Sequence, residues 1–292
     1  MNGKRFAIRL MVMQSTLFAA ETMVVHHIGA VMSVLQLAFI RAAAGVILAL
    51  LLTGHTGFAV LRTRQLPLQL ARGAVAAAYL WVMMFSFAHL PIADATAISH
   101  TQAAYIAAFS VLILGEAVSP VRWAAAMIGI AGALLIAKPS FAGWNTAYLV
   151  VLGGTGLNGL SFVLNRYLQR EDSETTTMFY TSLVPAFAYA PAAAFSGLPA
   201  ANALPWLPLL LFLGPVGVYC GIVAVRYASA AMLGPYTLLR LIIGILGGAV
   251  LFGELPDKLG AFGAMLIVLS CLLSSGALQV PSTWRRGVAA AD

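Results

Sequence analysis

The stretch "LILGE", residues 112–116, ends a long apolar run with a glycine and a glutamate, and "VLFGE", residues 250–254, ends another run in the same way. The two Gly-Glu pairs lie 138 positions apart, and residues 93–135 align on residues 231–273 without a gap. Matches between apolar residues are common by chance, but a shared glutamate is informative in a chain of which only 9% is charged. We interpret the two stretches as equivalent parts of an internal repeat.

The chain around these stretches is too apolar to cover a water-facing surface. Of its 292 residues 61% are hydrophobic, and the mean hydropathy is +0.94. A soluble globular chain is about half apolar and about a quarter charged. The apolar runs are continuous and do not alternate with polar residues, which favours membrane-spanning helices. The predicted fold class is an all-α polytopic membrane protein.

Ten apolar windows are long enough to cross a bilayer, which takes about 20 residues. They cover residues 8–25, 34–52, 73–89, 92–114, 121–137, 147–165, 177–195, 207–225, 231–252 and 259–278. Each half of the repeat then holds five spans, and because five is odd the second half enters the membrane from the opposite side. We predict two inverted five-helix repeats, residues 1–140 and 141–292, in one membrane domain around a central cavity.

Lysine and arginine orient this bundle. With the N-terminus in the cytoplasm, only Lys138 and Lys258 fall outside, and Arg41 and Arg240 fall within spans. The cytoplasmic side then holds Lys4, Arg5, Arg9, Arg62, Arg64, Arg72, Arg122, Arg166, Arg170, Arg226, Arg285 and Arg286. This bias predicts that both termini are cytoplasmic, in a bacterial inner membrane. It also accounts for the net charge of +7 without a nucleic-acid partner.

Ten helices in two groups of five, with "LILGE" closing the fourth and "LFGE" the ninth, resemble the EamA-type members of the drug/metabolite transporter superfamily. Arg41, in "AFIRAAAGVILALLL" at residues 38–52, is similar to an arginine that such proteins often carry in the second helix. The proline often found midway along helices four and nine is replaced by Ala103 and Leu241. Among the branches of this superfamily, the amino-acid and aromatic amino-acid exporters look closest. The resemblance implies a basket of helices around a cavity, with hairpins 3–4 and 8–9 moving as units.

An inverted repeat with few central polar groups is typical of secondary transporters. We expect export of small metabolites, namely amino acids including apolar and aromatic ones, by alternating access; lipophilic drugs or other metabolites are the alternative substrates. An intramembrane enzyme would need facing acids, histidines or cysteines, and a channel would need pore-lining rings. Neither pattern is present, so we predict no catalytic residue, metal or cofactor. The expected partners are a small-molecule substrate and the lipid bilayer, with the chain acting as a monomer.

Arg240 is the most informative candidate for substrate binding. It lies about nine residues into the ninth span, roughly 13 Å deep at 1.5 Å per residue, and no acid of the predicted spans lies at a similar depth. The planar guanidinium suits a substrate carboxylate in bidentate fashion. The alternative is an arginine that only bonds hydroxyls and the carbonyls at helix ends.

The other candidates for the cavity are neutral side chains within spans. Histidine titrates near neutral pH, so His100 is a candidate for sensing a proton gradient as well. Aromatic, methionine and amide side chains line pockets, but they also pack helices together. The candidates are Tyr79, Met83, His100, Asn158, Ser161, Tyr219 and Tyr236.

Six further residues are predicted to be structural or to take part in gating. Glu21 and Arg41 fall at similar depth in the first two spans and are expected to form an ion pair; the alternative is a carboxylate that couples protons or gates the outer side. Gly115, Glu116, Gly253 and Glu254 are expected to form paired turns on opposite faces of the membrane, because glycine permits the left-handed turn that ends a helix. A membrane thickness separates the two glutamates, so they cannot share a site.

Overall fold

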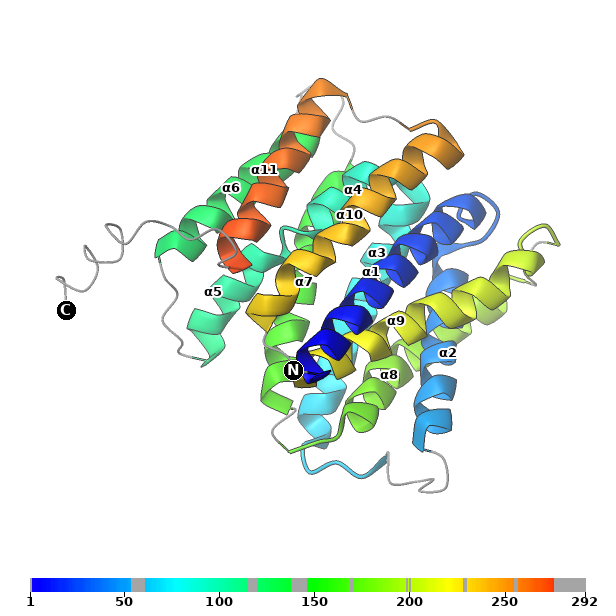
Figure 1. Ribbon diagram of the computed structural model, residues 1–292. Coiled ribbons are helices and arrows are strands. Elements are labelled where there is room, and N and C mark those ends of the chain that lie inside the picture. Colours follow the sequence, from blue (N-terminus) through cyan, green and yellow to red (C-terminus); the bar gives the residue numbers. More distant parts are fainter. Residues whose placement is uncertain are drawn as a thin grey trace.

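The computed structural model describes residues 2–53, 61–114, 120–137, 146–168, 171–197, 199, 201–227, 230–254 and 257–275. Within these ranges the chain forms eleven α-helices and no β-strand. In chain order (Figure 1) they are α1 (Asn2–Ile28), α2 (Val34–Thr53), α3 (Leu66–His89), α4 (Ile92–Ser99), α5 (Gln102–Leu114), α6 (Pro120–Ala137), α7 (Thr146–Leu168), α8 (Glu174–Phe195), α9 (Leu207–Tyr227), α10 (Ala230–Phe252) and α11 (Lys258–Ser275). A short 3₁₀ helix, η2 (Leu204–Trp206), precedes α9.

These helices fall on the ten predicted spans, which confirms the expected all-α membrane fold. Among the described residues, α1, α2, α3, α8 and the segment Leu204–Ala224 are long and apolar enough to cross a membrane. Shorter apolar stretches lie in α6, α10 and α11. Gly115 and Glu116, and the boundary between residues 140 and 141, lie outside the described residues.

The fourth span differs from the prediction because it is broken into α4 and α5. At the break the amides of His100 and Thr101 bond to carbonyls three residues back, each at 3.0 Å. The hydroxyls of Ser99 and Thr101 also return to carbonyls three residues back, at 2.7 and 2.8 Å. Such local bonds compete with the helical ladder. The equivalent stretch of α10, residues 237–239, stays helical.

The third span begins earlier than predicted, at Leu66 instead of residue 73. Pro67 lies in the first turn of α3, where a missing backbone N–H leaves no hydrogen bond unmade. The earlier start places Gln69 and Arg72, both buried, inside the bundle. The predicted third span began just after Arg72, whereas the structure places Arg72 inside α3, so the predicted boundary is wrong.

The two halves of the chain interleave. Helix α1 of the first half corresponds to α7 of the second. Helix α1 packs on α9 and α10 of the second half, and α7 packs in the equivalent way on α3 and α5 of the first half. The pairs α2 with α8 and α6 with α11 join equivalent helices of the two halves. Every large interface therefore has a partner under exchange of the halves, as the inverted repeat requires.

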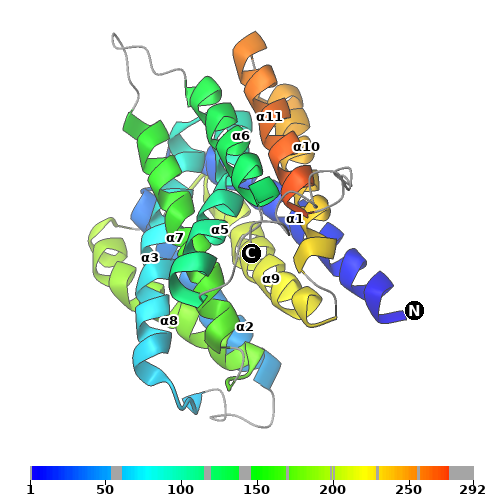
Figure 2. The ribbon, with the colours of Figure 1, turned by 90° about the vertical axis from the view of Figure 1, so that its left-hand side faces the viewer.

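The α6–α11 pair lies at the upper left of the bundle in Figure 1, and in Figure 2 the two helices run side by side at the top. The two helices touch through backbone: a Cβ on Gly132 would lie 2.6 Å from the carbonyl oxygen of Gly263, and the reverse holds as well. The Ser270 hydroxyl adds a bond of 2.6 Å to the Ala125 carbonyl. Small residues thus permit the close approach.

The largest buried core closes one end of the bundle, which we call the His89 end because α3 finishes there; the opposite end is the Leu66 end. The fully buried large side chains that gather at the His89 end are Ile28, Leu37, Met84, Phe87, Leu90 and Ile92. They come from α1, α2, α3 and α4 and from the α3–α4 connection. The smaller clusters near the Leu66 end join single helix pairs or triplets.

Candidate functional site

A cavity of about 360 Å³ lies at mid-depth between the two halves. This volume is in the range of small-molecule sites. Helices α1, α2, α3, α7, α8, α9 and α10 and the α4–α5 break supply its wall. Irregular backbone inside a membrane is tolerated where it lines a cavity, so the break in the fourth span is explained by its position.

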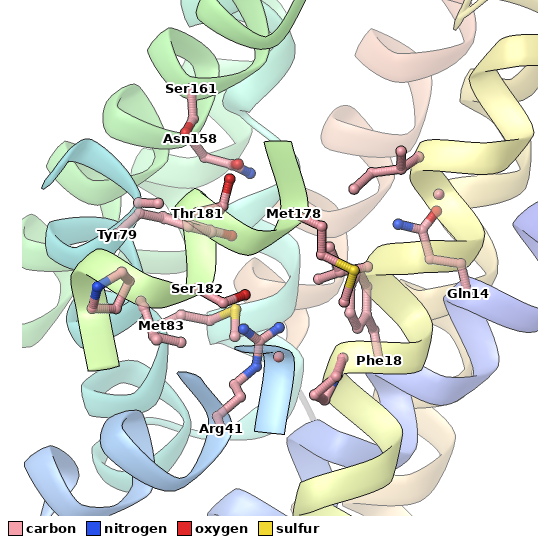
Figure 3. A pocket seen from close by; sticks show the side chains of 18 of the residues that line it. Gln14, Phe18, Arg41, Tyr79, Met83, Asn158, Ser161, Met178, Thr181 and Ser182 are labelled. Carbon is pink, nitrogen blue, oxygen red and sulfur yellow. The ribbon is translucent and has the colours of Figure 1, made fainter. Parts of the chain in front are cut away.

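The wall combines a few polar groups with apolar surface (Figure 3). Phe18, Tyr79, Met83, Met178, Pro185 and Pro215 supply most of the large apolar and aromatic groups. Gln14, Thr181 and Ser182 add neutral hydrogen-bonding groups. Three arginines, Arg41, Arg72 and Arg240, also line the cavity.

Arg41 is neutralised. Its Nε donates to Oε1 of Glu21 at 2.5 Å, and Glu21 is only 1% exposed. The predicted ion pair between the first two spans is therefore present. The second oxygen of Glu21, Oε2, is buried without a hydrogen-bond partner among the described residues.

Arg240 lies within the cavity wall with weak partners. Its Nη2 donates to the Thr22 hydroxyl at 3.4 Å, a long hydrogen bond. The guanidinium lies over the rings of Phe18 and Phe87, with each centroid 5.3 Å away. Its Nε has no hydrogen-bond partner, and no ion pair to Arg240 occurs among the described residues. Most of its donors are therefore free to bind another molecule.

Arg72 is 6% exposed and has even fewer contacts. Its Nη1 lies 3.5 Å from the carbonyl oxygen of Thr177, at the limit of hydrogen bonding, and its Nε has no hydrogen-bond partner among the described residues. No ion pair to it occurs within the described part of the chain. Pro67 is the sequence signal that could have placed Arg72 inside a helix. A proline is common in the first turn of a helix, and Pro67 precedes Arg72 by one to two turns.

His100 lies at the α4–α5 break, lines the cavity and is 7% exposed. Its Nε2 has no hydrogen-bond partner among the described residues. Next to the break, the Gln102 side-chain oxygen accepts a hydrogen bond from the Asn158 amide of α7. Ser161 lies one turn further along α7, also in the cavity wall. The Gln102–Asn158 hydrogen bond joins the first half of the chain to the second.

Tyr219 and Tyr236 were predicted to line the cavity, but the structure places them outside its wall. On α9 the cavity wall is formed by Pro215, Val218, Gly221 and Ile222, and the centre of this face lies roughly 90° around the helix from Tyr219. Tyr219 packs against the cluster that holds Met178 and Phe179. Tyr236 packs near Met11.

The Gly-Glu turn after α10 lies at the His89 end and takes no part in the cavity wall. Gly253 has φ +70°, the expected left-handed conformation. Glu254 accepts a hydrogen bond from the Ile92 amide at 2.9 Å, which caps α4, and its other oxygen lies 3.2 Å from Nε2 of His26. His26 Nδ1 lies 2.8 Å from the Phe87 carbonyl oxygen. Glu254 thus connects α1, α3 and α4 with the end of α10.

Sequence reasoning missed several residues of the cavity wall. Gln14 and Phe18 lie four residues apart on α1 and share a face. Gln102 aligns with Arg240 in the internal repeat, so the repeat itself was the available signal for it. No group of three or more metal-ligating side chains occurs among the residues described.

Comparisons with known proteins agree with this architecture. The EamA-like transporter family matches the chain twice, over residues 5–138 and 145–276. The pseudopaline exporter CntI of Pseudomonas aeruginosa is 28% identical over 273 residues, which are 92% of this chain and 95% of that one. The riboflavin transporter of Rhizobium johnstonii is 32% identical over 219 residues, which are 74% of this chain and 72% of that one.

One solved crystal structure shares the fold, with a TM-score of 0.64 at 18% identity, over 93% of this chain and 96% of that one. The two family matches together span nearly the whole chain, and each holds one half of the repeat. The chain therefore belongs to the EamA-like transporter family.

Proposed function

We propose that this chain is a secondary transporter that exports a small carboxylate-bearing metabolite, with amino acids as the first candidates. The observation that carries the proposal is the charge of the cavity. Three arginines line it, and the carboxylate of Glu21 neutralises one of them. Arginine stays charged in proteins. A buried charge without a partner is costly in a membrane, so the free guanidiniums favour an anionic ligand.

The apolar part of the wall suits the remainder of such a ligand. Phe18, Tyr79, Met83 and Met178 offer aromatic and flexible surface, and such residues dominate small-molecule sites. His100, Gln102 and Asn158 offer a few neutral polar groups. A carboxylate joined to an apolar or aromatic side chain matches both parts, whereas a neutral lipophilic drug would leave the arginines unpaired.

Two features support the proposed direction of transport: the bias of Lys and Arg, and the closed His89 end. The positive-inside rule favours the Leu66 end as the cytoplasmic end, and in this orientation the closed His89 end faces outward. Along α3, α8 and α9 the cavity wall reaches Arg72, Met178 and Ile222, which lie within four to six residues of the helix ends on the cytoplasmic side. This arrangement suits a state that loads substrate from the cytoplasm.

Relatives support transport of metabolites across a membrane. One is named an exporter of pseudopaline and another a transporter of riboflavin. In the proposed cycle the substrate binds between the halves, the helices of each half rock against the other, and the His89 end opens. The break at residues 99–101 is a natural place for bending, because its ladder of hydrogen bonds is interrupted.

The experiment is an efflux screen in proteoliposomes. Vesicles loaded with labelled amino acids, one at a time, are diluted with and without a pH gradient, and release is compared with that from protein-free vesicles. We expect saturable release of at least one amino acid, inhibited by an excess of the same compound. If none of the amino acids moves under either condition, amino-acid export is wrong. If the flux does not saturate, a carrier mechanism is wrong.

A further inference from the structure

The connection between α3 and α4 leaves two backbone groups without a partner in their own helix. The Phe87 carbonyl, in the last turn of α3, would bond to the amide of residue 91, but Pro91 has no amide hydrogen. The Ile92 amide lies at the start of α4, where the first amides have no acceptor within the helix. Pro91 is the N-cap of α4 and makes no side-chain hydrogen bond to it. Both groups therefore need partners from other parts of the chain.

His26 of α1 and Glu254 at the end of α10 supply these partners. The Nδ1 atom of His26 lies 2.8 Å from the Phe87 carbonyl oxygen, and Oε2 of Glu254 accepts a hydrogen bond from the Ile92 amide at 2.9 Å. The two side chains also meet, because Nε2 of His26 lies 3.2 Å from Oε1 of Glu254. The Glu254 amide bonds to the Gly248 carbonyl at 3.0 Å, which holds the glutamate in place. The His26–Glu254 contact thus joins the first half of the chain to the second.

The donors and acceptors of this pair balance only when the pair carries one extra proton. A carbonyl oxygen can only accept, so Nδ1 of His26 is the ring nitrogen that carries a hydrogen. In a neutral imidazole Nε2 is then an acceptor, and it faces a carboxylate oxygen that is an acceptor as well. The contact becomes a hydrogen bond when either Nε2 or the carboxylate is protonated. The closed His89 end therefore holds a proton that a neutral histidine beside a carboxylate lacks.

Other titratable and charged groups that the structure describes at this end have contacts of their own. They are His27 on α1, His89 on α3, Asp94 on α4, Tyr148 on α7, and Asp257 and Lys258 at the start of α11. His27 packs its ring on Trp206, and the Tyr148 hydroxyl donates to Asp94 at 2.6 Å. His89 and Asp257 bond to nearby backbone at 2.9 and 3.0 Å, and Lys258 is exposed. We therefore assign the proton to His26 and Glu254, the two ionisable groups that bond to the α3–α4 connection.

We propose that His26 and Glu254 form a proton-binding site that keeps the His89 end closed. When the pair loses its proton to water, two acceptors face each other and the contact between α1 and the end of α10 is lost. Water reaches the site, because the two side chains are 17% and 25% exposed. The closed state binds one proton more than the open state, so a higher pH favours opening and a lower pH favours closure. In the orientation taken from the proposed function, external acid favours return of the emptied carrier to the loading state.

Thiol labelling at different pH tests the inference without a transported substrate. The reporter is Ser99→Cys in the cavity wall, in a background where Cys220 and Cys271 are alanine. Lys258→Cys, at an exposed position of the His89 end, is labelled from the side that this end faces. A membrane-impermeant maleimide is added on that side of sealed membrane vesicles. Dividing the labelling rate of Ser99→Cys by that of Lys258→Cys removes the pH dependence of the thiol itself.

This normalised rate should rise roughly fivefold or more between pH 6 and pH 8, with a limit of about tenfold per pH unit for one proton. Glu254→Gln should abolish the rise, because its amide donates to Nε2 of a neutral His26 and its oxygen still accepts from the Ile92 amide. His26→Gln has no titrating ring and should abolish the rise as well, which keeps the test decisive if one variant fails to fold. His27→Gln, a change at the exposed neighbouring histidine, is the matched control and should respond as the wild type does.

A normalised rate that is flat or falls with pH in the wild type overturns the inference. A wild-type response in Glu254→Gln or His26→Gln also overturns it, because the proton would then lie elsewhere. The outcome is separate from that of the efflux screen. Saturable amino-acid efflux with flat labelling leaves the proposed function standing, and pH-dependent labelling without efflux leaves the proton-binding site standing.

Discussion

Three arginines line the cavity, and each has different surroundings. Arg41 has a carboxylate at 2.5 Å. Arg240 has two aromatic rings and one long hydrogen bond. In the part of the chain that the structure describes, Arg72 has one hydrogen-bond acceptor, the Thr177 carbonyl at 3.5 Å. An ion pair holds the first in place, while the other two keep donors for a ligand.

The Glu21–Arg41 pair makes a stability prediction. Arg41→Gln leaves the Glu21 carboxylate buried and unpaired, and such a loss costs about 3–5 kcal/mol. The double variant Glu21→Gln/Arg41→Gln removes both charges and should recover most of that loss. Thermal unfolding in detergent measures both. Equal melting temperatures for Arg41→Gln and the wild type would show that the pair carries no net stability.

Gly253 makes a second prediction at this scale. Its φ of +70° is disfavoured for a side chain with a Cβ, by roughly 1–2 kcal/mol. Gly253→Ala should therefore lower the melting temperature. Gly153→Ala is the matched control, because Gly153 is an exposed helical glycine and its added Cβ would meet nothing within 4 Å. If the two variants melt alike, the left-handed turn is not a constraint.

Single positions were only partly predictable from the sequence. Arg240, Tyr79, Met83, His100, Asn158 and Ser161 line the cavity as expected. Tyr219 does not, because residue type alone cannot tell which face of α9 turns inward. The predicted start of the third span was seven residues too late. Arg72 therefore fell outside the predicted span, whereas the structure places it in the cavity wall.

At the scale of elements, the fourth span shows how a local sequence changes a helix. Ser99, His100 and Thr101 supply bonds that end α4 after eight residues. Hydropathy over a long window does not detect such a break, because the flanking residues are apolar. The alignment of the two repeats does not predict the break either, because the equivalent residues of the second repeat, 237–239, are helical.

The cap of α4 by Glu254 makes a prediction about closure of the His89 end. Glu254→Ala removes both the bond to the Ile92 amide and the contact with His26, so α1, α4 and α10 lose a common anchor. Glu254→Gln keeps an acceptor for the amide and should have a smaller effect. Both changes should open the His89 end more often.

Thiol labelling measures this opening. Ser99→Cys places a reporter in the cavity wall, in a background where Cys220 and Cys271 are alanine. A membrane-impermeant maleimide added from the outer side should label it faster in Glu254→Ala than in the parent. Lys258→Ala, an exposed change near the same turn, is the control. Unchanged labelling in Glu254→Ala would mean that this turn does not hold the end closed.

At the scale of the whole molecule, the two halves form one body through paired interfaces. The strongest signals for this architecture were in the sequence: continuous apolar runs, two Gly-Glu turns 138 positions apart and a one-sided distribution of Lys and Arg. The bilayer determines the apolar runs and the distribution of Lys and Arg, and the repeat determines the two Gly-Glu turns. None of these signals depends on which face of a helix turns inward. The cavity depends on such faces, so only the structure locates it.

The α6–α11 contact makes a prediction at this scale. Gly132→Ala would place a Cβ 2.6 Å from the Gly263 carbonyl and force the two helices apart, and overpacking of this kind costs about 1–3 kcal/mol. The melting temperature should fall. Gly248→Ala is the control, since its nearest neighbours lie at an ordinary 3.7 Å. Equal stability of the two variants would argue against a rigid α6–α11 contact.

The central claim is that the cavity binds anionic substrate through arginine, and transport by Arg240→Gln tests it most directly. Efflux of a labelled amino acid from proteoliposomes is compared for the wild type, Arg240→Gln and the exposed control Arg64→Gln. Loss of a charge-assisted bidentate contact, worth about 1.5–3 kcal/mol, predicts at least a tenfold fall in Arg240→Gln and none in Arg64→Gln. Equal saturable efflux by Arg240→Gln and the wild type would contradict the account.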